Sequence, residues 1–155
     1  MQMKNRYVVV VVLLLLGLTT FTFASPRQVE KQKTLKGISE RVTNDKNIVL
    51  DDYNPTKTEL EAINKIFIVG CGSAYHVGMV SKYFFEKTTK IPVETDLASE
   101  FRYRNPVITK NDLCIFISQS GETADTLASL RKSKEKGAFT LSIVNVPYST
   151  IARES

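Results

Sequence analysis

The chain has few of the residues that build metal and redox sites. Its 155 residues include one histidine, His76, and two cysteines, Cys71 and Cys114, with no Cys-x-x-Cys pair. One histidine is too little for a zinc site of familiar composition, so we expect no metal site, and no cofactor is expected either. His76 stands at the start of a predicted helix, where a packed or solvent-facing imidazole is favoured over a catalytic one.

The two cysteines are predicted to be free thiols. Cys71 follows the carboxyl end of one predicted strand and Cys114 begins another, so about a strand length, roughly 13 Å, separates them. A disulfide requires Cα atoms within about 7 Å of each other. Free thiols favour a reducing compartment.

The sequence also lacks a surface of the kind that binds nucleic acid. Its net charge is +5, but lysine and arginine are scattered, and no basic stripe interleaved with aromatic residues occurs. The basic run at residues 131–136 is predicted to be the solvated face of a helix. With 43% hydrophobic and 24% charged residues, the composition is that of a globular protein of one domain.

Residues 1–24 are predicted to be a hydrophobic leader. Lys4 and Arg6 precede a run of mostly valine and leucine at residues 7–18, and Thr22 and Ala24 offer small side chains before a possible cleavage point. This order is typical of a secretory signal peptide. The apolar run is shorter than the roughly 20 residues of a membrane span, but extending it to residue 23 leaves a signal anchor open. The remaining alternative is a leader fused on or mis-assigned as the start of the gene.

Residues 25–56 are predicted to be a polar linker, with a helix over residues 27–38. From residue 57 onward the pattern alternates between helix and strand. Helices are predicted at residues 57–64, 74–87, 98–103 and 124–136, and strands at 66–69, 92–95, 113–117 and 139–144. This alternation predicts an α/β fold with a parallel, doubly wound sheet.

The helix over residues 74–87 carries large side chains at helical spacing. Those predicted to share one apolar face are Tyr75, Met79, Tyr83 and Phe84, with Lys82, Glu86 and Lys87 turned outward. Gly137 is predicted to end the helix at 124–136.

Two loops have a composition suited to ligand binding. In a parallel sheet, ligands bind beyond the carboxyl ends of the strands. The first loop, residues 70–74, has two glycines and precedes a helix, but Val77 stands where a Gly-x-Gly-x-x-Gly motif needs its third glycine. A dinucleotide site is therefore disfavoured, and a plain strand-to-helix turn would explain the glycines.

The second loop, residues 118–123, follows a buried strand and precedes a helix. Ser118, Gln119, Ser120 and Thr123 place three hydroxyls and an amide there, and a helix N-terminus adds N–H groups and partial positive charge. This favours a phosphate site over a simple N-cap, which needs only one hydroxyl. Glu122 is awkward in an anion site, so we expect it to point outward or to cap backbone groups.

Several motifs carry a resemblance to a known family. SQSGETADTL at residues 118–127 and ASEFRYR at 98–104 closely resemble the isomerase region of the glutamine–fructose-6-phosphate aminotransferase family, the glucosamine-6-phosphate synthases. GCGSAYH at 70–76 resembles the first loop of that family, and IVN at 143–145 and IARES at 151–155 fit its continuation. The likeness covers about residues 26–155 and is strongest from residue 66.

The resemblance implies a sugar isomerase (SIS) domain over residues 57–155, with a three-layer α/β/α, flavodoxin-like sheet that is incomplete at the C-terminus. It implies binding of fructose 6-phosphate or glucosamine 6-phosphate, with the phosphate held by Ser118, Gln119, Ser120 and Thr123. The family's first loop contacts the sugar through a hydroxyl pair. Ser73 keeps one of those hydroxyls and Ala74 loses the other, and residues 146–148 depart from the small, glycine-containing turn of the family.

The resemblance also implies parts that the sequence does not contain. The family begins with a glutaminase domain whose nucleophile is an N-terminal cysteine, whereas residue 2 here is Gln2. Its catalytic acid, lysine and histidine lie mostly in a second isomerase domain. We therefore assign no catalytic residue, leave open whether the chain is an enzyme, and expect no synthase activity from it alone.

Three interpretations stay open. In the first, the chain is a truncated piece of the isomerase half of a hexosamine-biosynthesis enzyme. In the second, it is a stand-alone sugar-phosphate-binding module that is exported or membrane-tethered. In the third, it is a non-functional truncated reading frame. The partner implied is a hexose 6-phosphate, and the resemblance allows a homodimer. The resemblance implies a cytoplasmic protein, whereas a working leader implies export, and membrane contact is expected only if the leader stays uncleaved.

Overall fold

A computed structural model describes residues 56–146 and 148–155 of the chain. The predicted leader at residues 1–24, and the linker at 25–56 apart from its last residue, lie outside the described residues. Both stay predictions, as does the helix expected over residues 27–38.

A four-stranded parallel sheet forms the centre of the described part. Its strands are β1 (Lys65–Gly70), β2 (Val93–Leu97), β3 (Asp112–Ser118) and β4 (Phe139–Val144), and their order in the sheet is β2-β1-β3-β4. The two central strands, β1 and β3, are almost wholly buried because both sheet faces are covered there, which is why they read as continuous apolar runs. The predicted parallel sheet is confirmed.

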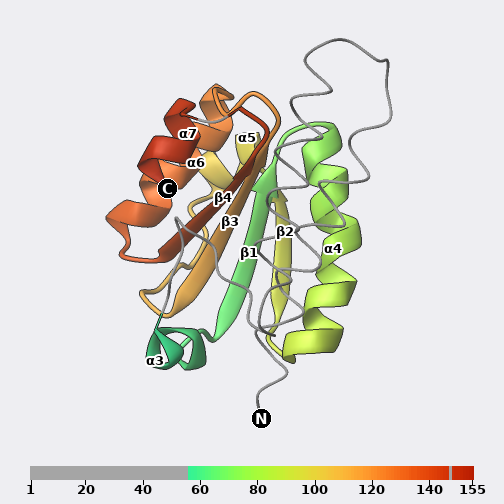
Figure 1. Cartoon of the computed structure of the whole chain (residues 1–155), viewed down its shortest axis with the longest axis vertical. Helices are drawn as coiled ribbons and strands as arrows, with labels where there is room; N and C mark the ends of the chain where they lie inside the picture. The colour runs from blue at the N-terminus through green and yellow to red at the C-terminus, as the bar shows by residue number, and fades with distance from the viewer. Residues whose placement is uncertain (1–55, 147) are drawn as a thin grey trace, which may run out of the picture. The chain divides into compact units, whose positions relative to one another are not determined.

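Helices cover both faces of this sheet (Figure 1). The helices are α3 (Lys57–Glu61), α4 (Ser73–Thr89), α5 (Ala98–Arg104), α6 (Ala124–Glu135) and α7 (Thr150–Glu154). Helix α4 lies on the face that carries Ile68, while α5, α6 and α7 lie on the face that carries Phe67. The three-layer α/β/α arrangement is confirmed for the described residues.

One hydrophobic core cluster lies between the sheet and helices α5 to α7. Phe67 of β1 meets Phe101 of α5 edge to face, with ring centroids 5.8 Å apart. Phe116, Leu130 and Ile151 complete the centre of this cluster, and all three are fully buried. The ASEFRYR segment is thus α5 itself, and its phenylalanine is a core residue.

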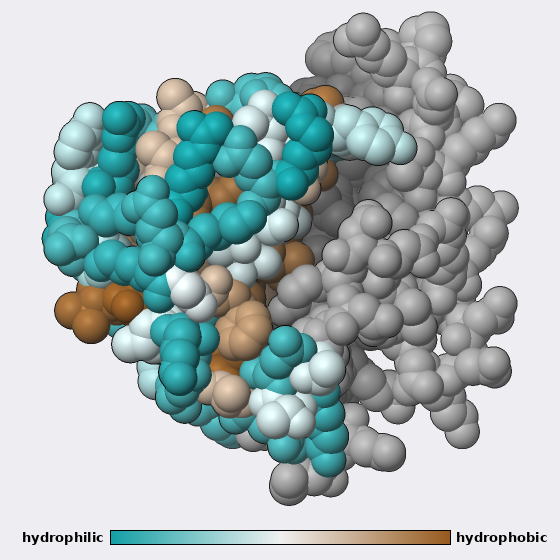
Figure 2. Space-filling model, turned by 90° about the vertical axis from the view of Figure 1, so that its left-hand side faces the viewer, coloured by the Kyte–Doolittle hydropathy of each residue, from teal (hydrophilic) through white to brown (hydrophobic). Residues whose placement is uncertain are grey.

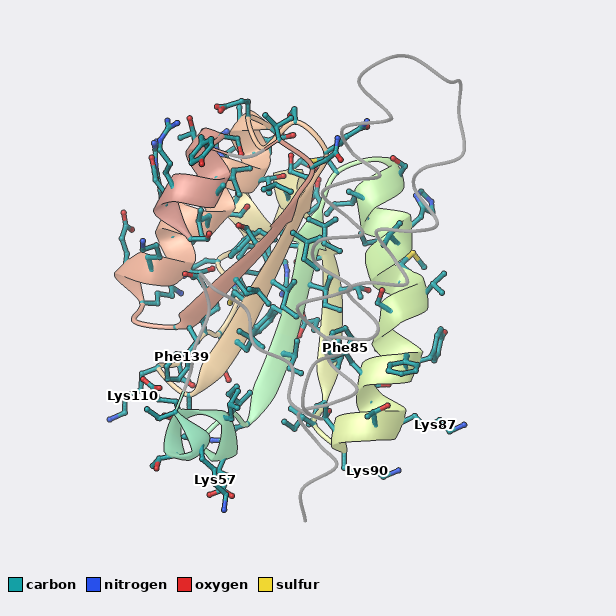
Figure 3. All side chains as sticks on the ribbon, in the orientation of Figure 1. Lys57, Phe85, Lys87, Lys90, Lys110 and Phe139 are labelled. Atoms are coloured by element: carbon teal, nitrogen blue, oxygen red, sulfur yellow. The ribbon has the colours of Figure 1, made fainter. Side chains whose placement is uncertain are left out.

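Helix α4 buries a different face from the one that its large residues predict. The buried residues are Gly78, Ser81, Phe85 and Thr89, and Tyr83 is 74% exposed. Gly78 lies so close to the sheet that an added Cβ would meet Ile68 at 2.9 Å, so the helix packs through its small residues. Phe85 points toward the sheet in Figure 3, whereas Lys87 points away from it. The predicted apolar face with Tyr83 and Met79 inward is wrong.

Helix α6 also packs through small residues. Thr126, Ser129 and Ser133 are buried, and the Ser129 hydroxyl donates to the Ala98 carbonyl of α5 at 3.0 Å. Gly137, at φ +78°, ends the helix as predicted, with its N–H donating to the Lys134 carbonyl. The side seen in Figure 2, on which α6 and α7 lie, is mostly hydrophilic, and Arg131 and Lys134 of the predicted solvated run are exposed.

Cys71 and Cys114 are both free, as predicted. Within residues 56–146 and 148–155, no helix is long and apolar enough to cross a membrane. The same residues contain no cluster of three or more histidine, cysteine or acidic side chains that could hold a metal ion.

Candidate functional site

A cavity of about 530 Å³ opens beyond the carboxyl ends of β1 and β3. These two strands are neighbours in the sheet, but α4 leaves β1 on one face and α6 leaves β3 on the other, so their loops diverge and leave a crevice. The volume is in the range of small-molecule sites. Both loops singled out in the sequence line this cavity.

All five residues predicted to bind a sugar phosphate line this cavity. Ser73 begins α4 and is exposed, Ser118 ends β3 and is buried, and the other three belong to the loop before α6: Gln119, Ser120 and Thr123. The structure therefore brings the predicted residues together, although they come from two loops about 45 residues apart in the chain.

Hydrogen bonds inside the second loop fix its shape. The Gly121 N–H donates to the Ser118 hydroxyl oxygen at 3.1 Å, and that oxygen lies 3.0 Å from the Thr123 hydroxyl oxygen. When Ser118 donates its own proton to Thr123, the Thr123 proton is left to point at a ligand. The Glu122 N–H donates to the Ser120 hydroxyl at 3.2 Å.

The start of α6 faces this loop without a side-chain cap. Thr123 is the N-cap residue, but its hydroxyl makes no capping hydrogen bond because it pairs with Ser118 instead. The first N–H groups of a helix have no partner inside the helix, and they carry about half a positive charge. The N-terminal end of α6 thus attracts anions, and it lies beside three hydroxyls.

Gly121 has a conformation and surroundings that suit only glycine. Its φ is +68°, and a Cβ at this position would overlap the side chain of Ser149. Ser149 is buried, and its hydroxyl has no hydrogen-bond partner among the described residues. The loop is therefore pressed against the segment that leads into α7.

Glu122 caps a backbone group, one of the two roles expected from the sequence. Its carboxylate accepts the Thr150 N–H, the first of α7, at 2.7 Å. This backbone hydrogen bond, a second hydrogen bond from the Thr150 hydroxyl and the nearby Arg153 lower the pKa of the Glu122 carboxyl. The carboxylate is therefore engaged with α7.

Ser73 and Ala74 of the first loop line the cavity. His76 is exposed, and its Nδ1 lies 3.0 Å from the Gly72 carbonyl oxygen of the same turn. It does not line the cavity. The structure thus places the histidine as a solvent-facing residue at a helix start, as predicted.

Asn145 and Val146 line the cavity but were not predicted as site residues. They follow the carboxyl end of β4, and the Asn145 N–H donates to the Gln119 carbonyl at 3.3 Å. The position after a third parallel strand is the signal that could have found them. Nearby Tyr148 has φ +62°, a conformation more natural to glycine, and the family resemblance implies a glycine-containing turn in this segment.

Thiol chemistry provides a probe of the cavity. Cys71 is half-buried and lines it, whereas Cys114 is fully buried, and burial raises the pKa of Cys114 to about 11. Because the thiolate is the reactive form, we expect iodoacetamide to modify Cys71 in the folded protein and to spare Cys114. Peptide mass spectrometry after short labelling checks this. Equal labelling of both cysteines in folded protein would contradict the described burial.

Comparison with known proteins agrees with this geometry. The family model described as "SIS domain" matches residues 59–155. The chain is 56% identical over 122 residues to the glutamine–fructose-6-phosphate aminotransferase (isomerizing) of Caldanaerobacter subterraneus, covering 79% of this chain and 20% of that protein. It is 54% identical over 127 residues to the same-named protein of Clostridium tetani, covering 81% of this chain and 21% of that protein.

A solved structure is similar as well. The C-terminal domain of glucosamine-fructose-6-phosphate aminotransferase from Francisella tularensis superposes with a TM-score of 0.61 at 45% identity, over 69% of this chain and 31% of that one.

The chain therefore belongs to the SIS domain family. Within this family its similarity is to the glutamine–fructose-6-phosphate aminotransferases, which confirms the resemblance carried by the sequence motifs. The chain spans about a fifth of the length of the curated relatives that it matches.

Proposed function

We propose that this chain binds a hexose 6-phosphate, fructose 6-phosphate or glucosamine 6-phosphate, in the cavity between its two loops. The phosphate lies on the Ser118–Thr123 loop, and the sugar extends toward Ser73. The observation that carries this proposal is the convergence of the hydroxyls of Ser118, Ser120 and Thr123 with the uncapped start of α6 in one cavity. The names of the relatives, which include fructose 6-phosphate, support this choice of ligand.

The composition of the cavity supports binding rather than proton transfer. No carboxylate, lysine, arginine or histidine occurs among its lining residues in the described part of the chain. A sugar isomerisation needs a positioned acid or base. We therefore propose that these residues hold the substrate, and that the acid–base groups of the aminotransferase reaction come from elsewhere in a longer protein of the relatives' type.

Titration calorimetry with fructose 6-phosphate tests the proposal. Replacing Ser120 by alanine is expected to weaken binding by about tenfold or more, because a hydrogen bond to a charged group contributes roughly 1.5–3 kcal/mol. Ser142→Ala is the matched control, since Ser142 lies on β4 outside the cavity and pairs with Ser155. Absence of binding by the folded wild-type chain would end the proposal.

Covalent labelling gives a second readout of the same site. Because Cys71 lines the cavity, bound fructose 6-phosphate is expected to slow its reaction with iodoacetamide, whereas free fructose at the same concentration does not. A homodimer, the cytoplasmic or exported location and the absence of nucleic-acid binding stay predictions.

A further inference from the structure

An acidic residue stands inside the proposed phosphate loop. Glu122 directly follows Gly121, and its own N–H is bonded to the Ser120 hydroxyl, so the side chain begins next to the groups proposed to meet the phosphate. Glu122 is exposed, and like charges within a few ångströms repel even where water weakens the repulsion. Some feature of the fold must therefore keep this carboxylate from opposing the ligand.

Helix α7 provides that feature. The Glu122 carboxylate accepts the Thr150 N–H at 2.7 Å, and the next residue, Ile151, donates its N–H to the Gly121 carbonyl at 3.0 Å. Two consecutive backbone N–H groups of α7 thus hold two consecutive loop residues. Arg153 adds a positive charge near the same carboxylate.

The remaining contacts leave the loop little freedom. Ser149 fills the space beside Gly121, so a side chain at position 121 would overlap it. Arg153 is itself held, with its guanidinium bonded to the Tyr148 carbonyl and, at 3.2 Å, to the Thr150 hydroxyl. The residues at the start of α7 therefore form a fixed hydrogen-bonding site for the Glu122 carboxylate.

We infer that the backbone N–H of Thr150 is a positioning group for the anion site: it holds the Glu122 carboxylate on α7 and away from the bound phosphate. This inference rests on the sugar-phosphate site proposed above. A phosphate in the loop then meets hydroxyls and the start of α6, while the negative charge of Glu122 is directed to α7. Residues 149–151 set the affinity of the site without belonging to its lining.

Proline at position 150 removes this N–H together with the Thr150 hydroxyl, which bonds Arg153 and Glu122. Thr150 is the first residue of α7, where proline is well tolerated because that N–H has no partner inside the helix. Ser149 already has φ −62° and ψ 163°, the extended conformation that a residue before proline prefers. Thr150→Ala is the matched control, since it removes the hydroxyl and keeps the N–H.

Calorimetry with fructose 6-phosphate on the full 155-residue chain gives the expected pattern. Thr150→Pro is expected to bind about tenfold more weakly than wild type, because the released carboxylate approaches the phosphate. Thr150→Ala, which keeps the N–H and loses only the hydroxyl, is expected to bind more tightly than Thr150→Pro. Adding Glu122→Gln to Thr150→Pro restores binding to within about twofold, because the amide carries no charge. Misplacement of the loop alone would not be rescued by this neutral substitution.

A second pair of variants leaves α7 untouched. Glu122→Asp keeps the charge on a side chain that is one methylene shorter and does not span the distance to the Thr150 N–H. Glu122→Asn has the length of aspartate and carries no charge. Glu122 is exposed, so neither change threatens the fold. We expect Glu122→Asp to bind about tenfold more weakly than Glu122→Asn.

The outcomes separate this inference from the proposed function. If wild type binds fructose 6-phosphate and both Thr150→Pro and Glu122→Asp bind it as tightly as wild type does, the positioning role is wrong and the sugar-phosphate site stands. If Thr150→Pro is weak and Glu122→Gln does not restore it, the role of α7 is steric, and the inference about charge is wrong. If folded wild type does not bind, the proposed function falls and takes the inference with it.

Discussion

Replacing Gly121 by alanine is expected to lower the affinity for fructose 6-phosphate by about a hundredfold or more, since misplacement of a binding group by about 1 Å can have effects of this size. The added Cβ overlaps Ser149, and an L-residue at φ +68° costs about 1–2 kcal/mol more than glycine. Either the loop or the entry to α7 must move. Calorimetry measures the loss of binding, and urea unfolding measures the loss of stability.

Gly137→Ala is the matched control for this substitution. Gly137 has φ +78°, but its nearest neighbour would lie 3.8 Å from the new Cβ, and it is not a cavity residue. The Gly137→Ala variant should lose a similar amount of stability to backbone strain and keep its affinity for fructose 6-phosphate. If Gly121→Ala retained wild-type affinity, the loop would not need its observed shape to bind.

Truncation of Phe101 to alanine is expected to lower the free energy of unfolding by about 3–5 kcal/mol, the usual effect of removing a buried aromatic ring. Phe101 is fully buried against Phe67, at the point where α5 meets the sheet. A small domain is stabilised by about 5–15 kcal/mol in total, so much of the margin would be lost. Urea unfolding followed by far-UV circular dichroism measures the change.

Tyr103→Ala provides the comparison on the same helix. Tyr103 is 74% exposed, so its removal should change stability by about 0.5 kcal/mol or less. If Phe101→Ala and Tyr103→Ala were equally stable, the result would contradict the described packing of α5 against the sheet.

The sequence predicted the elements well because local signals mark them. Strands β1 and β3 are continuous apolar runs that end in Gly70 and Ser118, and Gly137 ends α6. Strand and helix alternate, and this order restricts the sheet to a parallel arrangement. The two loops that line the cavity were identified from their position after these strands and from their hydroxyl content.

The face that α4 buries could not be predicted from size and hydropathy. Tyr83 and Met79 have the spacing of a core face, but the helix packs through Gly78 and Ser81 because small residues allow a closer approach to Ile68. Hydropathy ranks residues by their transfer from water and does not register how closely two backbones can approach.

The sequence by itself determined the class of fold and the hydroxyl content of the Ser118–Thr123 loop, because both depend on residues close together in the chain. Only the tertiary structure decided that Asn145 reaches the same cavity, that Ser149 fills the space beside Gly121, and that the Glu122 charge is directed to Thr150. These contacts join segments more than 20 residues apart, and their geometry is set by how the helices pack on the sheet.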